Sequence, residues 1–176
     1  KEHYQQTVPQ TCQQGFIAFD KIGINNSNKI VAEDSINHID DRLSLPIVGR
    51  TDLHFTDSNG AERSSSAVST PVDSVLSVCE LKTSYQKIGR AKKDGSRSFS
   101  SARLPSFPNI NHLQQLAFYC FALEKRSSVS PYLIYLTADD FIIYTEKNCT
   151  DLEPKNLKNY YEQLVSNCIR KERLLS

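Results

Sequence analysis

An apolar run over residues 75–83 contains both a glutamate and a lysine, and this combination restricts the possible folds. The run is short, starts with β-branched character and precedes a polar stretch, which is typical of a buried β-strand. Side chains alternate along a strand, so Glu80 and Lys82 lie on the same face. Buried strands rarely carry charges that have neither a partner nor a task. The fold must therefore give Glu80 and Lys82 either a charged or hydrogen-bonding partner or a functional role.

The rest of the chain predicts further strands and two helices. Apolar alternation and β-branched content indicate strands, and apolar residues at helical spacing indicate helices. The strands are expected over residues 29–33, 45–55, 131–137 and 141–145, and the helices over residues 112–125 and around 157–169. In the strand over 45–55, one face is expected to carry Ile47, Gly49, Thr51, Leu53 and Phe55. This order predicts an α/β fold with a mixed central β-sheet flanked by helices.

Two segments carry weaker signals. Residues 1–28 are polar and rich in Gln and Asn, and are interpreted as loop with a weak helix or strand at 15–19. The linker 85–111 contains a basic loop over 87–103, and the Ser-rich stretch 63–74 is interpreted as an extended loop. Because the chain starts at Lys1 and contains no Met, we expect a trimmed or partial chain in which upstream motifs are missing.

Length and charge limit the function classes. With 176 residues the chain fits a single domain, 1–176, that is long enough to bury a core. Lys and Arg number 21 against 20 Asp and Glu, which excludes a histone-like polycation. Binding of nucleic acid then requires local clustering of charge, and the loop over 87–103 provides it. This loop contains six basic residues and a single acidic one, Asp94, a composition suited to phosphate contacts. The basic residues are Lys87, Arg90, Lys92, Lys93, Arg97 and Arg103.

The five cysteines form no CxxC pair and their number is odd. Cys79, Cys120 and Cys168 lie in apolar runs, where cysteine behaves as a small hydrophobic residue. We interpret all five as free thiols in a reducing, intracellular compartment. Bacterial cytoplasm, for a phage-encoded protein, and the mitochondrial matrix both fit, and the chain contains neither a signal peptide nor an apolar stretch long enough for a membrane span.

Asp52 extends the motif at Glu80 and Lys82. If the strands that carry them are neighbours, the two carboxylates meet, and a hard cation such as Mg²⁺ or Mn²⁺ relieves their repulsion. The backbone carbonyl of Leu81 offers a further oxygen ligand. Lys82 then lies beside a metal-bound water, where it can orient the water, accept its proton or stabilise the phosphorane charge. An ordinary charged pair on an exposed strand face is the simpler alternative.

The helix over 112–125 adds Gln115 and Tyr119, which are four residues apart and share one helix face. A Gln amide and a Tyr hydroxyl on one face can hold a phosphate or a nucleotide, or brace Lys82. An exposed Gln beside a half-buried Tyr is the alternative interpretation.

Taken in order, these residues resemble the RecB-type branch of the PD-(D/E)xK nucleases. The chain carries Gly49-Arg50-Thr51-Asp52, then Glu80-Leu81-Lys82-Thr83, then Gln115 and Tyr119 in a Q-x-x-x-Y helix. Within this branch it is most similar to the group that contains the mitochondrial genome maintenance exonucleases and small phage-encoded exonucleases. The resemblance covers most of residues 30–145.

The resemblance implies a restriction-endonuclease-like core and metal-dependent exonucleolysis of DNA, favouring single-stranded ends. It makes Asp52 and Glu80 metal ligands, beside the Leu81 carbonyl considered above, and Lys82 the catalytic lysine. It makes Gln115 and Tyr119 substrate-binding residues, and Arg103, Lys92 and Lys93 are expected to contact phosphates. The chain departs from the family in two respects: an upstream helix with a metal-site His or Glu has no clear match, and the cysteine cluster of the iron–sulfur members is missing.

Two other functions fit the same residues. A nucleic-acid-binding module without catalysis would use residues 87–103 and turn over no substrate. An endonuclease of the same superfold would also cut circular single strands, although the near-neutral charge argues against a wide duplex footprint.

Overall fold

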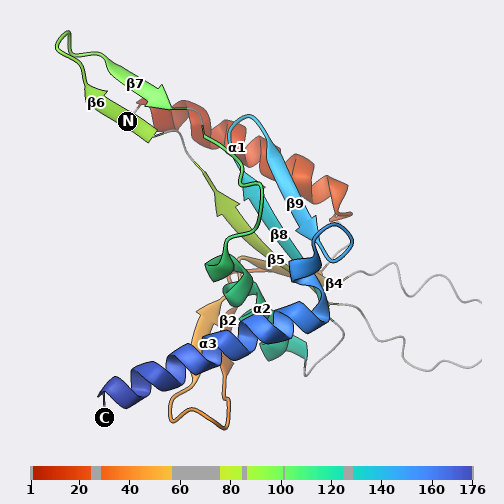
Figure 1. Ribbon diagram of the computed structural model, residues 1–176. Coiled ribbons are helices and arrows are strands. Elements are labelled where there is room, and N and C mark those ends of the chain that lie inside the picture. Colours follow the sequence, from red (N-terminus) through yellow and green to blue (C-terminus); the bar gives the residue numbers. More distant parts are fainter. Residues whose placement is uncertain are drawn as a thin grey trace, which may run out of the picture.

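The computed structural model describes residues 2–24, 29–56, 76–84, 87–100, 102–124 and 129–175. Within these residues the protein is an α/β structure in which a mixed five-stranded sheet is covered by helices (Figure 1). The prediction of a mixed α/β fold is therefore confirmed. Two of the segments outside the described residues are 57–75 and 125–128. The predicted Ser-rich loop over 63–74 lies in the first of them.

The central sheet has the strand order β1-β4-β5-β8-β9. β5 and β8 are parallel, and each of the other neighbouring pairs is antiparallel. Strands β5 and β8 are interior strands of the sheet, and most of their residues are buried. The strands are β1 (Lys29–Ala32), β4 (Leu53–Thr56), β5 (Leu76–Thr83), β8 (Val129–Leu136) and β9 (Phe141–Thr145).

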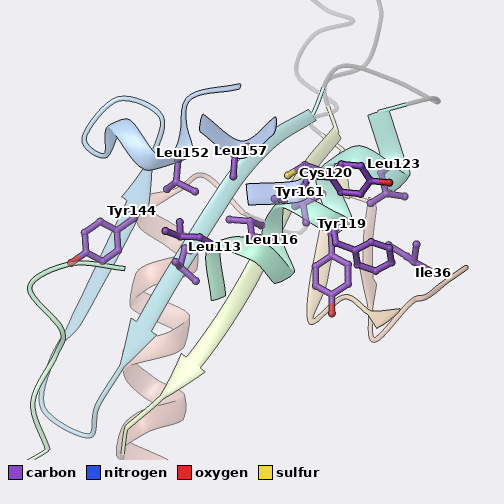
Figure 2. Close-up of a cluster of buried hydrophobic side chains, with 14 of the residues drawn as sticks. Ile36, Leu113, Leu116, Tyr119, Cys120, Leu123, Tyr144, Leu152, Leu157 and Tyr161 are labelled. Carbon is purple, nitrogen blue, oxygen red and sulfur yellow. The ribbon is translucent and has the colours of Figure 1, made fainter. Parts of the chain in front are cut away.

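Helices cover both faces of this sheet (Figure 1). The helices are α1 (Glu2–Lys21), α2 (Ile110–Glu124) and α3 (Pro154–Leu175), with a 3₁₀ turn over Thr150–Leu152. Helix α1 packs on the face that carries Leu53, Cys79 and Ile134. Helices α2 and α3 pack on the opposite face, where a larger apolar core includes Leu116 and Leu157 (Figure 2).

A long, bent hairpin supplies two strands of the sheet and a smaller sheet of its own. Strands β2 (Ser35–His38) and β3 (Ile47–Arg50) pair with each other in the same register that β1 and β4 follow. The register continues across the bend, where Glu33 N–H bonds to Asp52 O at 3.1 Å and Thr51 N–H bonds to Asp34 O at 2.9 Å. Glu33 has a φ of 52°, a left-handed conformation that turns the chain there.

This bend corrects the prediction of a single strand over 45–55. Thr51 and Asp52 separate two strands that belong to different sheets. The predicted alternation is nevertheless confirmed, because Thr51, Leu53 and Phe55 are buried while Val48 and Arg50 are exposed. Side-chain alternation survives a bend in a paired hairpin, and it was therefore a poor guide to where the strand ends.

The interpretation of residues 1–28 as mainly loop is also wrong, although the helix considered for residues 15–19 is present. Residues 2–21 form α1, which lies against the sheet. Among residues 7–21 its buried positions are Thr7, Thr11, Gly15 and Ala18, spaced four, four and three residues apart. A helix that buries small residues packs closely on a sheet but has no stripe of large apolar side chains, which is the usual sign of an amphipathic helix.

The basic loop over 87–103 is in part a two-stranded ribbon, so the prediction of a loop is wrong there. Strands β6 (Lys87–Ala91) and β7 (Arg97–Ser100) are antiparallel and separate from the central sheet. At the turn, Gly95 adopts a φ of 79° and the side chain of Asp94 accepts a hydrogen bond from Ser96 N–H at 2.9 Å. The ribbon extends beyond the C-terminal end of β5 (Figure 1).

The other predicted elements are confirmed. The two strands joined at residues 138–140 are β8 and β9, and the two predicted helices are α2 and α3. All five cysteines are free thiols; Cys79 and Cys120 are buried as predicted, whereas Cys168 is only partly buried. In the part of the chain that the structure describes, every helix is too short or too polar to cross a membrane.

Candidate active site

Strand β5 places Glu80 and Lys82 together, as the alternation predicts. The Glu80 side chain is fully buried, and the Lys82 side chain is 24% exposed. The Lys82 ammonium donates a hydrogen bond to Oε1 of Glu80. The two residues therefore form an enclosed ion pair that opens to solvent on the lysine side, which excludes the alternative of a charged pair on an exposed strand face.

Asp52 reaches the same strand through its carboxylate. Its Oδ2 accepts a hydrogen bond from the N–H of Leu81 at 2.8 Å. Pairing between β4 and β5 ends at Leu53 and Cys79, so Leu81 lies just beyond the last strand-to-strand pair. The Asp52 carboxylate thus accepts the hydrogen bond from the Leu81 N–H that the backbone of a longer β4 would otherwise accept. Because the N–H and C=O of one strand residue point to the same side, the carbonyl of Leu81 also lies on the side of Asp52.

The first residue of the Gly49-Arg50-Thr51-Asp52 segment has a packing role. A Cβ on Gly49 would lie 2.6 Å from Cε1 of Phe118 and 2.8 Å from Cε1 of Tyr119. Both distances are shorter than Cβ atoms tolerate, so only glycine lets β3 approach α2 this closely.

Gln115 and Tyr119 connect Lys82 to the hairpin. The Lys82 ammonium donates to Oε1 of Gln115 at 3.2 Å, and Nε2 of Gln115 donates to the Tyr119 hydroxyl at 2.9 Å. The Tyr119 hydroxyl in turn donates to the carbonyl oxygen of Arg50 at 2.6 Å. Tyr119 is buried, which excludes the alternative of a merely half-buried tyrosine. Its ring and hydroxyl brace the site rather than face solvent.

The charge balance around Glu80 is incomplete. Burial raises the pKa of Glu80 to about 7, the Lys82 hydrogen bond opposes this rise, and the nearby Asp52 charge adds to it. Among the described residues, Oε2 of Glu80 has no hydrogen-bond partner although it is enclosed. A buried carboxylate oxygen without a partner is costly, so the site favours an additional positive group at this atom.

The donor set fits a hard divalent cation. Asp52 and Glu80 contribute carboxylate oxygens, and Leu81 contributes a carbonyl on the same side. Such all-oxygen ligation is what Mg²⁺ and Mn²⁺ prefer, with water completing the shell. Within the described ranges, however, no group of three or more His, Cys, Asp or Glu side chains gathers at one point. The protein therefore offers two carboxylates there.

The predicted phosphate contacts lie on the surface. Lys92, Lys93 and Arg103 are all exposed. Lys92 and Lys93 occupy the turn of the β6–β7 ribbon, and Arg103 follows that ribbon. These three side chains make no hydrogen bond or ion pair with another described residue, so the structure does not join them to Asp52, Glu80 and Lys82.

Sequence reasoning missed His112 and Tyr135. His112 is three residues before Gln115 on α2, and its Nδ1 lies 2.8 Å from the Tyr135 hydroxyl. Tyr135 is the register partner of Lys82 across the parallel β5–β8 pair. The spacing of His112 and Gln115 on one helix was a visible signal, but the contact with Tyr135 joins two elements and leaves no local pattern.

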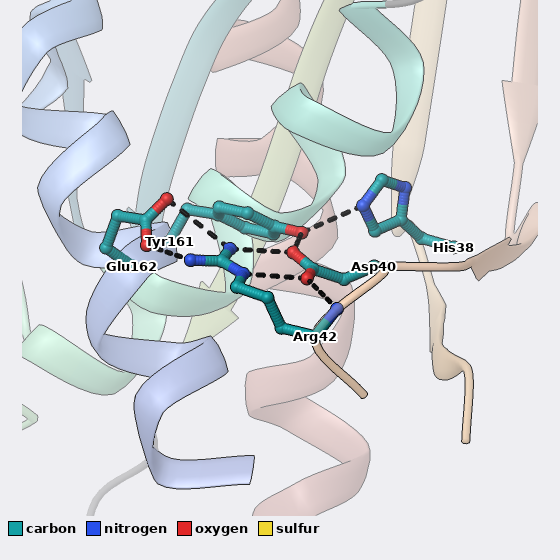
Figure 3. A network of polar contacts seen from close by, with 5 residues as sticks. All are labelled: His38, Asp40, Arg42, Tyr161 and Glu162. Carbon is teal, nitrogen blue, oxygen red and sulfur yellow. Dashed lines mark hydrogen bonds and ion pairs between the residues drawn. The ribbon is translucent and has the colours of Figure 1, made fainter. Parts of the chain in front are cut away.

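A second polar network fastens the hairpin to α3 (Figure 3). Asp40 accepts hydrogen bonds from Arg42 at 2.7 Å and from the Tyr161 hydroxyl at 2.8 Å. His38 Nε2 lies 2.8 Å from the same hydroxyl, and Arg42 also pairs with Glu162. Since the hairpin continues into Arg50 and Asp52, this network helps to fix one side of the candidate site.

Comparisons with known proteins identify no family. No family model matches the chain, and no curated protein matches it. A solved structure titled "Crystal structure of SSO0001" is similar at 17% identity and a TM-score of 0.37, over 85% of this chain. The matched part is 56% of that protein, so the chain spans little more than half of its length. A likeness this low carries no conclusion about fold or function.

Proposed function

We propose that this protein is a Mg²⁺- or Mn²⁺-dependent deoxyribonuclease that hydrolyses phosphodiester bonds from single-stranded DNA ends. One observation carries the proposal: the fully buried Glu80, whose Oε2 is unpartnered among the described residues, pairs with the Lys82 ammonium and is close enough to Asp52 for that carboxylate to raise its pKa. The resemblance to RecB-type PD-(D/E)xK nucleases supports the same assignment of roles.

The three residues divide the chemistry. Asp52 and Glu80, with the carbonyl of Leu81, would hold the cation. When bound, the cation supplies Lewis-acid polarisation of the phosphate and lowers the pKa of a coordinated water. Lys82 carries three N–H donors, and two of them bond to Glu80 and Gln115. The third is available to orient the attacking water or to bond to a non-bridging phosphate oxygen, whose negative charge grows as the water attacks.

Gln115 and Tyr119 keep Lys82 in position. The hydrogen bonds from Lys82 to Gln115 and from Gln115 to Tyr119 fix the direction of the ammonium group. A lysine stem has four rotatable bonds, so this restraint removes conformations in which the donor misses the substrate. We assign Gln115 and Tyr119 this positioning role in addition to substrate binding.

The basic ribbon and Arg103 would bind the DNA backbone. Lys92, Lys93 and Arg103 are exposed and have no acidic partner among the described residues, which leaves them available for phosphates. The ribbon follows directly after the strand that carries Glu80 and Lys82. With five free cysteines, we assign the protein to a reducing compartment, either bacterial cytoplasm or the mitochondrial matrix.

End-labelled single-stranded DNA tests this proposal. The wild type, Lys82→Ala and Glu80→Gln are each incubated with substrate labelled at the 5′ or the 3′ end, in Mg²⁺, Mn²⁺ and EDTA. We expect metal-dependent release of short products by the wild type alone, and the order of release gives the polarity. Equal cleavage by Lys82→Ala would show that the activity has another origin.

Two other functions can be distinguished from an exonuclease by the choice of substrate and by the presence of product. An endonuclease of the same superfold would cut circular single-stranded DNA, which an exonuclease leaves intact. A binding module without catalysis would bind DNA in a salt-dependent manner and release no product with any divalent ion. The enclosed Glu80–Lys82 pair favours catalysis, because a binding module has no need for a buried carboxylate with an unpartnered oxygen.

A further inference from the structure

His112 lies next to the candidate site without belonging to the motifs that define it. It occupies the first turn of α2, on the same face as Gln115, and it contacts Tyr135, the register partner of Lys82. Burial lowers the pKa of His112, and the Lys82 charge lowers it further. The imidazole is therefore neutral at neutral pH and carries its proton on one nitrogen only.

The hydrogen bonds of Tyr135 indicate which nitrogen that is. The Tyr135 hydroxyl accepts a hydrogen bond from Asn109 N–H at 3.0 Å, and His112 Nδ1 lies 2.8 Å away. The hydroxyl proton needs an acceptor, and among the described residues Nδ1 of His112 is the one within reach. Nδ1 therefore accepts, which places the His112 proton on Nε2.

The Nε2–H group is an available donor. It has no hydrogen-bond partner among the described residues, and His112 is half-buried rather than enclosed. The enclosed polar side-chain atoms without a partner, in the same part of the chain, are His54 Nδ1 and Glu80 Oε2. His112 Nε2 is not one of them, so its N–H is accessible to solvent, and Lys82 is close enough for its charge to act on the imidazole.

We infer that His112 binds a phosphate of the DNA backbone through Nε2–H, at a position adjacent to the phosphate that Lys82 contacts. This inference rests on the proposed function. A neutral N–H beside an ammonium group suits a phosphodiester. The Lys82 ammonium attracts the phosphate by its charge, and the imidazole N–H adds a directional hydrogen bond. Tyr135 is then a positioning residue, which holds the imidazole in the tautomer that leaves Nε2–H free.

Three substitutions separate this role from a packing role. His112→Ala removes the ring, and His112→Asn keeps a polar atom near Nδ1 but offers no donor at Nε2. His112→Gln places an amide N–H near the position of Nε2. Asn111→Ala, on the exposed side of the same helical turn, is the matched control. Thermal unfolding of each variant shows whether the fold is retained.

The measurement is the affinity for a fluorescently labelled single-stranded oligonucleotide, in EDTA and in Ca²⁺, by fluorescence anisotropy. We expect the Kd to rise at least about tenfold for His112→Ala and His112→Asn, the lower end of the effect of a lost hydrogen bond to a charged group. His112→Gln is expected to stay within about threefold of the wild type. Tyr135→Phe should weaken binding less than His112→Ala, because the ring remains.

The outcome separates this inference from the nuclease proposal. Unchanged binding by His112→Ala, or binding by His112→Gln as weak as that of His112→Ala, would overturn the inference. If the wild type cleaves DNA and His112→Ala leaves both Kd and KM unchanged, this inference alone fails. If no cleavage occurs but the binding order is as expected, the nuclease proposal fails and the phosphate position stands.

Discussion

The Tyr119 hydroxyl donates a hydrogen bond of 2.6 Å to the carbonyl oxygen of Arg50, which lies two residues before Asp52. It is the last of three bonds that run in one direction, from Lys82 to Gln115, from Gln115 to Tyr119 and from Tyr119 to Arg50. Gln115 and Tyr119 each accept one of these hydrogen bonds and donate the next. The lysine on β5 and the hairpin that carries Asp52 are thereby fixed to the same face of α2.

Removal of the Tyr119 hydroxyl should therefore loosen the lysine. Tyr119→Phe leaves Gln115 Nε2 and Arg50 O without this partner, and we expect a loss of about 1 kcal/mol in unfolding free energy. Cleavage of single-stranded DNA should fall about tenfold, because Lys82 loses its restraint. Tyr160→Phe is the control, since the Tyr160 hydroxyl bonds to Asp151 away from the site. An equal loss of cleavage in both variants would show that the effect is general destabilisation.

Gly49 should tolerate no side chain. A methyl group at this position overlaps ring carbons of Phe118 and Tyr119, so Gly49→Ala must displace either the hairpin or α2. We expect a destabilisation of about 1–3 kcal/mol, the usual cost of overpacking, together with loss of cleavage. Chemical denaturation measures the first effect and the end-labelled DNA assay the second.

Gly15→Ala is the matched control for that substitution. Its new methyl group would lie 3.5 Å from Cδ1 of Leu136, an ordinary contact, and the position is inside a helix. Replacing a helical glycine by alanine typically stabilises by about 0.5–1 kcal/mol. If both variants were equally stable, the close approach between β3 and α2 would not limit residue 49.

The sequence predicted the centre of the site better than its surroundings. Alternation within one apolar strand was sufficient to place Glu80 and Lys82 on the same side, and the spacing of four residues placed Gln115 with Tyr119. Both patterns are local, and both are confirmed by the hydrogen bonds that join Lys82 to Glu80 and Gln115 to Tyr119. The position of Asp52 depended on pairing between two strands, which one sequence indicates only weakly.

The missed features have physical reasons of their own. Helix α1 buries small residues such as Thr11 and Gly15, so it lacks the apolar stripe on which helix prediction relies. The β6–β7 ribbon is rich in Lys, Ser and Gly, which have low strand propensity, although Asp94-Gly95 is a common hairpin turn. The His112–Tyr135 contact joins residues 23 positions apart on a helix and a strand, and no periodic pattern reports such a pair.

The turn of the ribbon should contribute binding through charge alone. We expect Lys92→Ser combined with Lys93→Ser to weaken DNA binding at low salt and to reduce the slope of log K against log salt by up to about 1.4, two phosphate contacts on a single strand. Lys155→Ser with Lys158→Ser removes the same charge from exposed positions on α3 and is the control. An unchanged slope in the ribbon variant would exclude the turn from the binding surface.

Asp40 should stabilise the hairpin in a pH-dependent manner. The Arg42 hydrogen bond holds the pKa of Asp40 well below its usual value of 3.8, so its stabilisation is present above that value and is lost as the pH falls. Asp40→Asn is therefore expected to cost about 1–2 kcal/mol at pH 7 and progressively less below pH 4. Asp41→Asn, at the exposed neighbouring position, should cost little at either pH. The free energies of unfolding of Asp40→Asn and the wild type are compared across this pH range. If their difference stayed constant down to pH 2, Asp40 would not be the source of the pH dependence.

Glu80 should have the opposite effect on stability. Burial raises its pKa from an ordinary value of 4.5 to about 7, so folding favours the protonated carboxyl. In EDTA, the contribution is complete below pH 4.5 and is lost as the pH rises through about 7. We expect the unfolding free energy to fall across this window by up to about 3 kcal/mol, at 1.36 kcal/mol per pKa unit. Glu80→Gln removes the titrating group, so it should be more stable than the wild type at pH 8 and show a flatter profile.

Addition of Mg²⁺ or Mn²⁺ at pH 8 connects this titration to the proposed site. A cation that binds only the folded protein raises its thermal unfolding temperature, and the ionised Glu80 is the ligand whose charge it offsets. We expect this increase in the wild type, a smaller one in Asp52→Asn and little or none in Glu80→Gln. If Mn²⁺ stabilised Glu80→Gln as much as the wild type, the buried carboxylate would not be a metal ligand. Its raised pKa would then reflect burial against Lys82 and Asp52 alone.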